Sequence, residues 1–277
     1  MSIKGDIPRN YILDLSGKFL FMRHGQSLFN KIKEEPRKYN PELIDAHLSE
    51  DGINQAKSKQ EELNKLDIEK VYVSPFYRAL ETMIYSLQNH PKKDKIIAIV
   101  NPKLSEVVST VHDFIFDIKQ NKKQFNMNSS IKVDWSYFDE YTKHSEYDEN
   151  FFYFENMNLL DEKRKKEEYL KLKSLYEKGN LNEYRFEIGE FVKQNKNIYR
   201  RFESFKHANE RFNELKLYLN QEFKETINDN EKKILCISHS SFIKAATSSV
   251  PFLKDQVEDN MDNLYQTQHT EIITILI

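Results

Sequence analysis

Cysteine is nearly absent from this chain of 277 residues, which contains only Cys236. A single thiol excludes an internal disulfide and is typical of a reducing compartment. Long apolar runs are also missing, because none approaches the roughly 20 residues of a membrane-spanning helix. The first residues lack the hydrophobic centre of a signal peptide. We therefore expect a cytoplasmic protein that does not act on membranes.

An excess of charge of either sign is missing as well, since the formal net charge is −2. A chain that binds nucleic acid is usually strongly basic, so no nucleic-acid partner is expected. The basic run from Lys163 to Lys166 is followed at once by Glu167 and Glu168, which is typical of a solvated helix face. The expected partner is a small molecule, and the sequence does not set the oligomeric state.

Aromatic residues are abundant. Hydrophobic residues make up 39% of the chain, and 19 Phe and 15 Tyr supply mass for a core despite 31% charged residues. The length allows one large domain or two small ones. We predict a single domain over residues 1–277, with an α-rich insertion at about 115–200, where the pattern is least regular.

Short buried runs alternate with helical patterns along the chain. Apolar runs predict strands at 18–22, 71–73, 96–100 and 234–237, and a closing strand at 271–277. Apolar spacings of three and four residues, with Ser49 as an N-cap and Gly179 as a C-cap, predict helices at about 49–66, 76–89, 160–178 and 201–223. The alternation is typical of an α/β protein, a three-layer sandwich whose mostly parallel central sheet is flanked by helices.

The end of the first strand carries Arg23, His24 and Gly25. Ligands of open α/β sheets bind beyond the carboxyl ends of strands, so His24 lies where chemistry is expected. A neutral imidazole is a good nucleophile, and a neighbouring guanidinium favours anionic substrates. The group therefore predicts phosphate chemistry. Taken alone, a strand-end histidine satisfied by hydrogen bonds is the simpler alternative.

Three further strand ends carry residue types that a phosphoryl transfer needs, namely Arg78, Glu106 and His239. In this hypothesis His24 becomes a phosphohistidine, while Arg23 and Arg78 bind the phosphate oxygens through their planar donor groups. His239 donates to the same oxygens. Glu106 protonates the leaving alkoxide and then deprotonates the incoming water.

Four motifs at these positions resemble those of the histidine phosphatase superfamily, in the branch of phosphoglycerate mutases and fructose-2,6-bisphosphatases. The motifs are Arg23-His24-Gly25-Gln26-Ser27 with Asn30, Leu48-Ser49 with Gly52, Gln55 and Ala56, Ser74-Pro75 with Arg78, Ala79 and Thr82, and Ser238-His239-Ser240. Their order and approximate spacing also fit. The resemblance covers about 18–115 and 200–250, and it is thin over 115–200.

The resemblance implies a metal-independent phosphomonoesterase or mutase. We expect no cofactor for this chain. It places Asn30 and the Gly25 backbone in the phosphate pocket, together with the two arginines and His239. It also places the general acid at Glu106, with Asp113 as the alternative.

Two departures separate this chain from cofactor-dependent phosphoglycerate mutases. Those enzymes usually carry a Trp-Asn pair where this chain has Phe29-Asn30, and a Cys-Gly-Trp-type segment that residues 33–47 lack. The leading hypothesis is therefore a phosphatase of a small phosphorylated metabolite or similar monoester. A phosphoglycerate mutase and a catalytically silent binding protein are the alternatives. Substrate choice is expected to lie in 31–47 and 107–200, two segments predicted as a loop and as mostly insertion.

Other residues have simpler interpretations. Cys236 is expected to be buried and inert in its strand. Trp135 and the aromatic run 151–154 could form a lid, but a separate small core is the simpler account. A surface turn is favoured for His112 and Asp113. The remaining histidines share no metal-ligand spacing and are expected in surface or structural positions: His47, His90, His144, His207 and His269.

Overall fold

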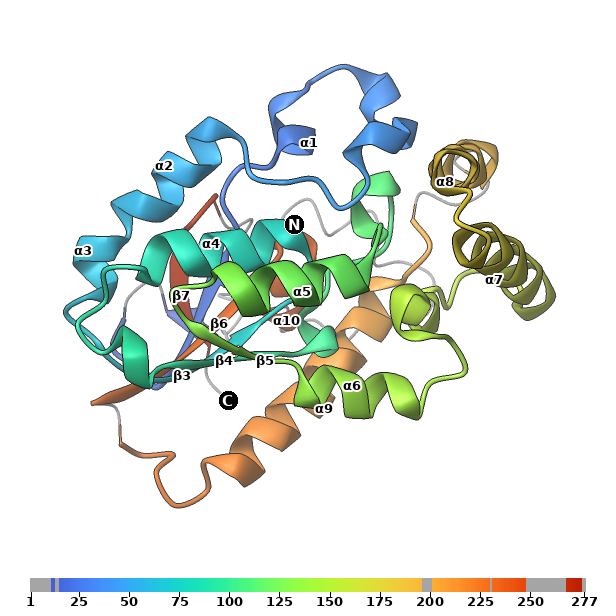
Figure 1. The fold of residues 1–277 in the computed structure, drawn as a ribbon. Helices are drawn as coiled ribbons and strands as arrows, with labels where there is room; N and C mark the ends of the chain where they lie inside the picture. Colours follow the sequence, from blue (N-terminus) through green and yellow to red (C-terminus); the bar gives the residue numbers. More distant parts are fainter. Residues whose placement is uncertain (1–10, 13–14, 196–200, 230, 248–267, 276–277) are drawn as a thin grey trace, which may run out of the picture.

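A central sheet organises the protein (Figure 1). The computed structural model describes residues 11–12, 15–195, 201–229, 231–247 and 268–275. Within them seven strands pair in the order β1-β7-β2-β6-β3-β4-β5. The strands are β1 (Tyr11–Ile12), β2 (Phe19–Arg23), β3 (Asp67–Val73), β4 (Ile97–Val100), β5 (Lys132–Asp134), β6 (Lys232–Ser238) and β7 (Ile272–Ile275). Neighbours from β2 to β5 are parallel, whereas β7 is antiparallel to both β2 and β1. The predicted mostly parallel sheet is confirmed.

Successive side chains of a strand point to opposite faces of a sheet, and here both faces are covered. Leu20 and Met22 of β2 belong to one buried cluster, while Phe19 and Phe21 belong to another. The first cluster packs against α4 (Tyr77–Leu87), which is flanked by α2 (Glu50–Ser58), α3 (Gln60–Leu63) and α5 (Ile118–Asn128). The second packs against α9 (Phe205–Glu222) and α10 (Ser240–Thr247). Figure 1 shows α4 and α5 on one side of the sheet and α9 on the other, which confirms three layers.

The segment at 115–200 is α-rich, as predicted, but it also contributes a strand to the sheet. Besides α5 and β5 it contains α6 (Ser136–Lys143), the 3-10 helix η6 (Glu149–Asn156), α7 (Glu162–Glu177) and α8 (Leu181–Asn195). β5 pairs in parallel with β4, and Val133 lies opposite Ala98. The sequence does not reveal β5, because one apolar residue between two charged residues gives no periodic signal.

The aromatic run in η6 belongs to the main core. Phe151, Phe152, Tyr153 and Phe154 are each at most 1% exposed. They share one hydrophobic cluster with Leu80 of α4. The run therefore forms neither a lid nor a separate core. This cluster is continuous from the sheet into the segment, and the single domain over residues 1–277 stays a prediction.

Several predicted elements have different ends in the structure. The helix expected over 49–66 divides at Lys59 into α2 and α3. The expected loop at 31–47 contains two 3-10 helices, η1 (Glu35–Tyr39) and η2 (Pro41–Leu43), after the short α1 (Leu28–Lys31). Both 3-10 helices have proline in their first two positions, where proline lacks no needed donor. The last two residues of the expected strand at 271–277 lie outside the described residues.

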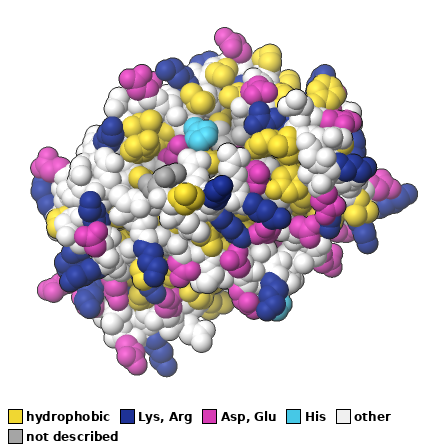
Figure 2. Space-filling view, in the orientation of Figure 1, with side chains coloured by type: hydrophobic (Ala, Val, Ile, Leu, Met, Phe, Trp, Pro, Cys, Tyr) yellow, Lys and Arg dark blue, Asp and Glu magenta, His cyan; other side chains and the backbone are white. Residues whose placement is uncertain are grey.

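The face in Figure 2 shows basic and acidic side chains interspersed, in keeping with the small net charge.

Among the helices of the described ranges, none combines the length and the apolar composition that crossing a membrane requires.

Two motif glycines allow two backbone segments to touch beside the end of β2. A Cβ on Gly25 would lie 2.6 Å from the carbonyl oxygen of Gly52, and a Cβ on Gly52 would lie 2.0 Å from that of Gln26. Ser49, the confirmed N-cap of α2, strengthens this contact, because its backbone N–H donates to the Gln26 carbonyl at 2.9 Å. Glycine at both positions therefore lets the start of α2 pack on the turn that follows His24.

We expect Gly52→Ala to lower the free energy of unfolding by about 1–3 kcal/mol, because the new methyl group would force the two backbones apart. It should also shift the NMR resonances of the His24 turn. Denaturant unfolding measures the first effect.

Gly179→Ala is the control for that variant. Gly179 has a φ of 73°, so alanine is strained there, but no atom lies within 4 Å of an added Cβ. The control should lose about 1 kcal/mol without any change at His24. A Gly52→Ala protein with wild-type stability and an unchanged His24 turn would contradict the packing argument.

Candidate active site

Two histidines meet at the carboxyl edge of the sheet. β2 and β6 are parallel neighbours with Arg23 opposite Ser238, so the next residues, His24 and His239, leave the sheet side by side. The His24 N–H donates to the Ser238 carbonyl at 3.0 Å. The two imidazole centres are 5.0 Å apart, and both side chains are buried. The strand register thus builds a pair of facing imidazoles.

The protonation of His24 follows from its contact with the backbone. Its Nδ1 lies 2.6 Å from the Gly25 carbonyl oxygen, which can only accept, so Nδ1 carries the hydrogen. Burial lowers the pKa of His24 well below its usual value, and the charges of Arg78 and Arg23 lower it further. At neutral pH the ring is uncharged, and Nε2 keeps its lone pair. Nε2 is therefore the atom able to act as a nucleophile.

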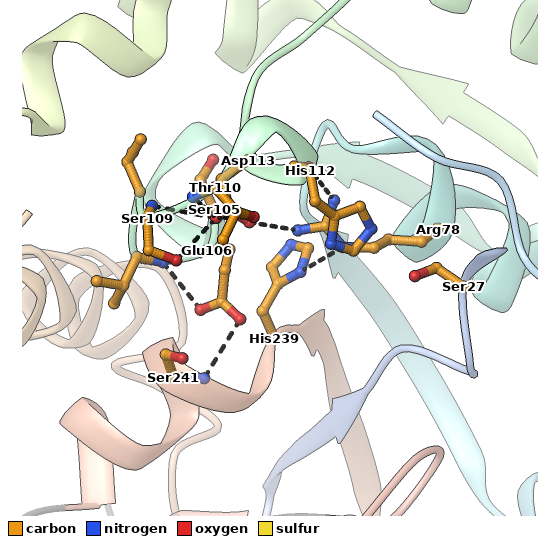
Figure 3. A network of polar contacts seen from close by, with 12 residues as sticks. Ser27, Arg78, Ser105, Glu106, Ser109, Thr110, His112, Asp113, His239 and Ser241 are labelled. Atoms are coloured by element: carbon orange, nitrogen blue, oxygen red, sulfur yellow. Dashed lines mark hydrogen bonds and ion pairs between the residues drawn. The ribbon is translucent and has the colours of Figure 1, made fainter. Parts of the chain in front are cut away.

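Arg78, in the first turn of α4, joins three parts of the site (Figure 3). Its Nε donates to Nδ1 of His239 at 3.2 Å, and its two terminal nitrogens donate to the His112 carbonyl at 2.8 Å and to Asp113 Oδ1 at 3.2 Å. Because guanidinium only donates, Nδ1 of His239 must accept. Nε2 of His239 then carries a hydrogen and donates to the Ser74 hydroxyl at 2.7 Å.

Glu106 lies beside the N-terminus of α10 (Figure 3). One carboxyl oxygen accepts from the N–H of Val107 at 2.8 Å and of Phe242 at 3.1 Å, and the other is 3.4 Å from the N–H of Ser241. Burial raises the pKa of Glu106 to about 7, and the nearby Asp113 carboxylate raises it too. A carboxyl group that titrates near neutral pH can both give and take a proton.

Asp113, the alternative general acid, has a different environment. Its Oδ1 accepts from Arg78, and its Oδ2 accepts from the N–H and hydroxyl groups of Ser109 and Thr110. Burial raises the pKa of Asp113 above its usual value, and Arg78 and these donors offset only part of that rise. Protonation would disrupt one of these contacts. The favoured surface turn was wrong, because His112 and Asp113 are both buried.

His112 and His269 are near His24. The sequence left a place at the site entrance open for His112 but favoured a surface turn, and it predicted a surface or structural position for His269. Their ring centres lie 6.3 Å and 6.1 Å from that of His24. His112 stacks on Phe29 with 4.5 Å between ring centres. Among the described residues, Nε2 of each ring is buried and has no hydrogen-bond partner. His269 precedes β7, and β7 is antiparallel to β2, which brings this ring to the end of β2. The position before a strand is visible in the sequence, but the pairing of that strand with β2 is not.

The remaining predicted site residues have protein partners. The N–H of Gly25 donates to the Thr82 hydroxyl at 2.9 Å. Asn30 forms a capping box of α1 with Ser27. Arg23 is half-buried, and burial lowers its pKa while the Glu106 charge raises it. Elsewhere, Cys236 is buried as expected. In the described part of the chain no group of three or more His, Cys, Asp or Glu residues could hold a metal ion.

Residues 19–110 match the family model of the histidine phosphatase superfamily (branch 1). The matched residues include Arg23, His24, Arg78 and Glu106, and the match ends before His112, Asp113 and His239. No curated protein matches the chain.

Solved structures give distant similarities. A mycobacterial glucosyl-3-phosphoglycerate phosphatase is 13% identical, with a TM-score of 0.47 over 92% of this chain and 88% of that chain. A phosphoserine phosphatase of Entamoeba histolytica is 17% identical, with a TM-score of 0.43 over 92% of this chain and 88% of that chain. A phosphoglycerate mutase of Bacillus anthracis is also 17% identical, with a TM-score of 0.40 over 83% of this chain and 77% of that chain. Similarities this distant say nothing about which activity this chain has.

Asp113→Asn should lower the pKa of Glu106, because it removes a negative charge that raises it. An NMR titration of the carboxyl carbon of Glu106 measures the change directly. Asp94→Asn, in the 3-10 helix η3 (Lys93–Lys95), is the control and should leave that titration unchanged. An unaltered Glu106 titration in Asp113→Asn would contradict the assigned electrostatic coupling.

Proposed function

We propose that this protein is a phosphomonoester hydrolase that forms a phosphohistidine at His24 on a small phosphorylated substrate. The observation that carries the proposal is the neutral imidazole of His24, with Nε2 available, facing His239 beside two guanidinium groups. The family match over 19–110 supports it. So does the pKa of about 7 at Glu106, which suits a group that works as acid and base in turn.

In the first step of the proposed reaction, Arg23 and Arg78 bind the phosphate oxygens, and Nε2 of His24 attacks phosphorus. The bond from phosphorus to the leaving oxygen breaks, and Glu106 gives that oxygen its proton. His239 turns its Nε2–H from Ser74 to the phosphate and stabilises the charge that develops there. In the second step, the Glu106 carboxylate takes a proton from water, whose oxygen attacks phosphorus as the phosphorus–nitrogen bond breaks.

We propose that the hydrolysis is metal-independent, because two arginines of the chain itself supply the positive charge that the phosphate needs. Asn30 and the Gly25 backbone stay predicted phosphate ligands. The Gly25 N–H would first have to leave the Thr82 hydroxyl. Asn30 contacts Ser27 through its Oδ1 and its backbone N–H, so its side-chain amide N–H group would be the phosphate donor. His112 joins the proposed site, because its buried Nε2 offers a hydrogen-bonding atom near the reacting phosphate. The cytoplasmic location stays a prediction.

His24→Ala should abolish phosphate release from an aryl phosphate and prevent any acid-labile phosphoenzyme from forming. Wild type should keep its rate in EDTA. His144→Ala is the control, since that ring is exposed, follows the C-terminal end of α6 and pairs with Glu140. Activity that survives in His24→Ala would overturn the proposal. A wild type that interconverts 3- and 2-phosphoglycerate with 2,3-bisphosphoglycerate, and releases no phosphate, would point to the mutase instead.

The pH dependence should reveal Glu106 as the acid of the first step. Its protonated form is needed, so kcat/KM for an alkyl phosphate should fall as the pH rises through about 7. His24 stays neutral in that range, because its pKa lies well below the usual value. Glu106→Gln should lower kcat/KM about 100-fold and remove the alkaline fall. An unchanged alkaline fall in Glu106→Gln would assign that titration to another group.

A further inference from the structure

A buried ion pair lies behind Glu106 and outside the group of residues around His24. Glu203, just before α9, and Arg211, within α9, are at most 5% exposed. The Arg211 guanidinium donates to both carboxylate oxygens of Glu203, with N–O distances of 3.0 to 3.1 Å. The planar guanidinium thus contacts both carboxylate oxygens, and this geometry fixes the orientation of the two side chains relative to each other.

This pair holds the backbone on both sides of Glu106. On the N-terminal side, Arg211 donates to the Ser105 carbonyl at 2.9 Å and to the Lys103 carbonyl at 2.7 Å. On the C-terminal side, the Val108 N–H lies 3.3 Å from a Glu203 carboxylate oxygen. The carbonyl of Val108 also accepts from the backbone N–H of Glu203 at 3.3 Å.

The same guanidinium also contacts the element that holds the Glu106 carboxyl group. It lies over the Phe242 ring, 4.7 Å from the ring centre. The N–H of Phe242 donates to Glu106 at 3.1 Å. Arg211 therefore contacts both the loop that carries Glu106 and the start of α10, which binds its side chain.

We propose that the Glu203–Arg211 pair is a positioning element that aims the carboxyl group of Glu106 at the leaving oxygen of the substrate. The inference rests on the proposed function and extends it to two residues that touch no substrate. A stability role alone would not require this arrangement, because buried ion pairs often add little net stability. The position of the catalytic carboxyl group affects the rate strongly, since displacing such a group by about 1 Å can lower the rate about 100-fold.

The test uses two substrates that differ in their need for an acid. An alkyl phosphate needs a proton on its leaving alkoxide, whereas 2,4-dinitrophenyl phosphate releases a stable anion without one. The value of kcat/KM includes only the steps up to the phosphoenzyme, so later water attack does not enter it. Both substrates are measured on the same sample, and the ratio of their kcat/KM values is therefore independent of the folded fraction.

Arg211→Lys keeps the charge but removes the fork, and Glu203→Gln keeps the shape but removes the charge. In both variants kcat/KM for the alkyl phosphate should fall at least about tenfold, and kcat/KM for dinitrophenyl phosphate should fall less than about threefold, since only the acid step is impaired. The alkaline fall in kcat/KM for the alkyl phosphate should also shift or weaken. Glu106→Gln gives the reference pattern.

Glu214→Gln is the matched control, because it breaks the exposed Lys103–Glu214 ion pair, whose carboxylate comes from α9, without touching either member of the buried pair. Its substrate ratio should equal that of wild type. Equal losses on both substrates in Arg211→Lys and Glu203→Gln, or no loss on either, would overturn the positioning role. A wild type that forms no phosphohistidine and hydrolyses neither substrate would instead overturn the proposed function, and the inference with it.

Discussion

The parallel pairing of β2 with β6 is the constraint on which the site depends. Nothing in the local sequence links residue 24 to residue 239, which are separated by most of the chain. The hydrogen-bond register places Arg23 opposite Ser238 and thereby sets the two following imidazoles 5.0 Å apart. β3 lies on the other side of β6 with Val73 opposite Ile237, so Ser74 comes to the ring of His239. A slip by one residue would turn these side chains to the wrong face.

The site also depends on balancing charge in a buried volume. Two guanidinium groups and two carboxyl groups lie near two neutral imidazoles, and each affects the pKa values of its neighbours. Asp113 is held by Arg78 and by the donors of a tight turn, whereas Glu106 accepts from the backbone N–H groups of Val107 and of the start of α10. The two carboxyl groups thus have different surroundings, which suit them to the different roles proposed above. Arginines left without such partners would be costly to bury.

The strand ends were predictable because short apolar runs and the residues after them are local signals. His24, Arg78, Glu106 and His239 were found in that way, and so was the layered fold. Other features depend on pairings that no local pattern encodes. His269 approaches His24 only because β7 runs antiparallel to β2.

Burial could not be inferred for polar residues either. A His-Asp pair in a loop is usually exposed, yet here Arg78 draws His112 and Asp113 inward. Arg211 is a charged residue, so the apolar spacing that predicted its helix gave no sign that its side chain is buried. The helix was predicted, but the contact of Arg211 with the loop that carries Glu106 was not.

The strand β5 limits how far the chain can be shortened. It occupies the outer margin of the sheet and satisfies the amide and carbonyl groups of β4 that would otherwise face solvent. Excising the whole 115–200 region would uncover those groups on a strand with the sequence Ile97–Val100. Such a margin is a template on which a second molecule can add a strand of its own. β5 therefore covers the edge that β4 would otherwise present, and a shortened form would need another cap at that margin.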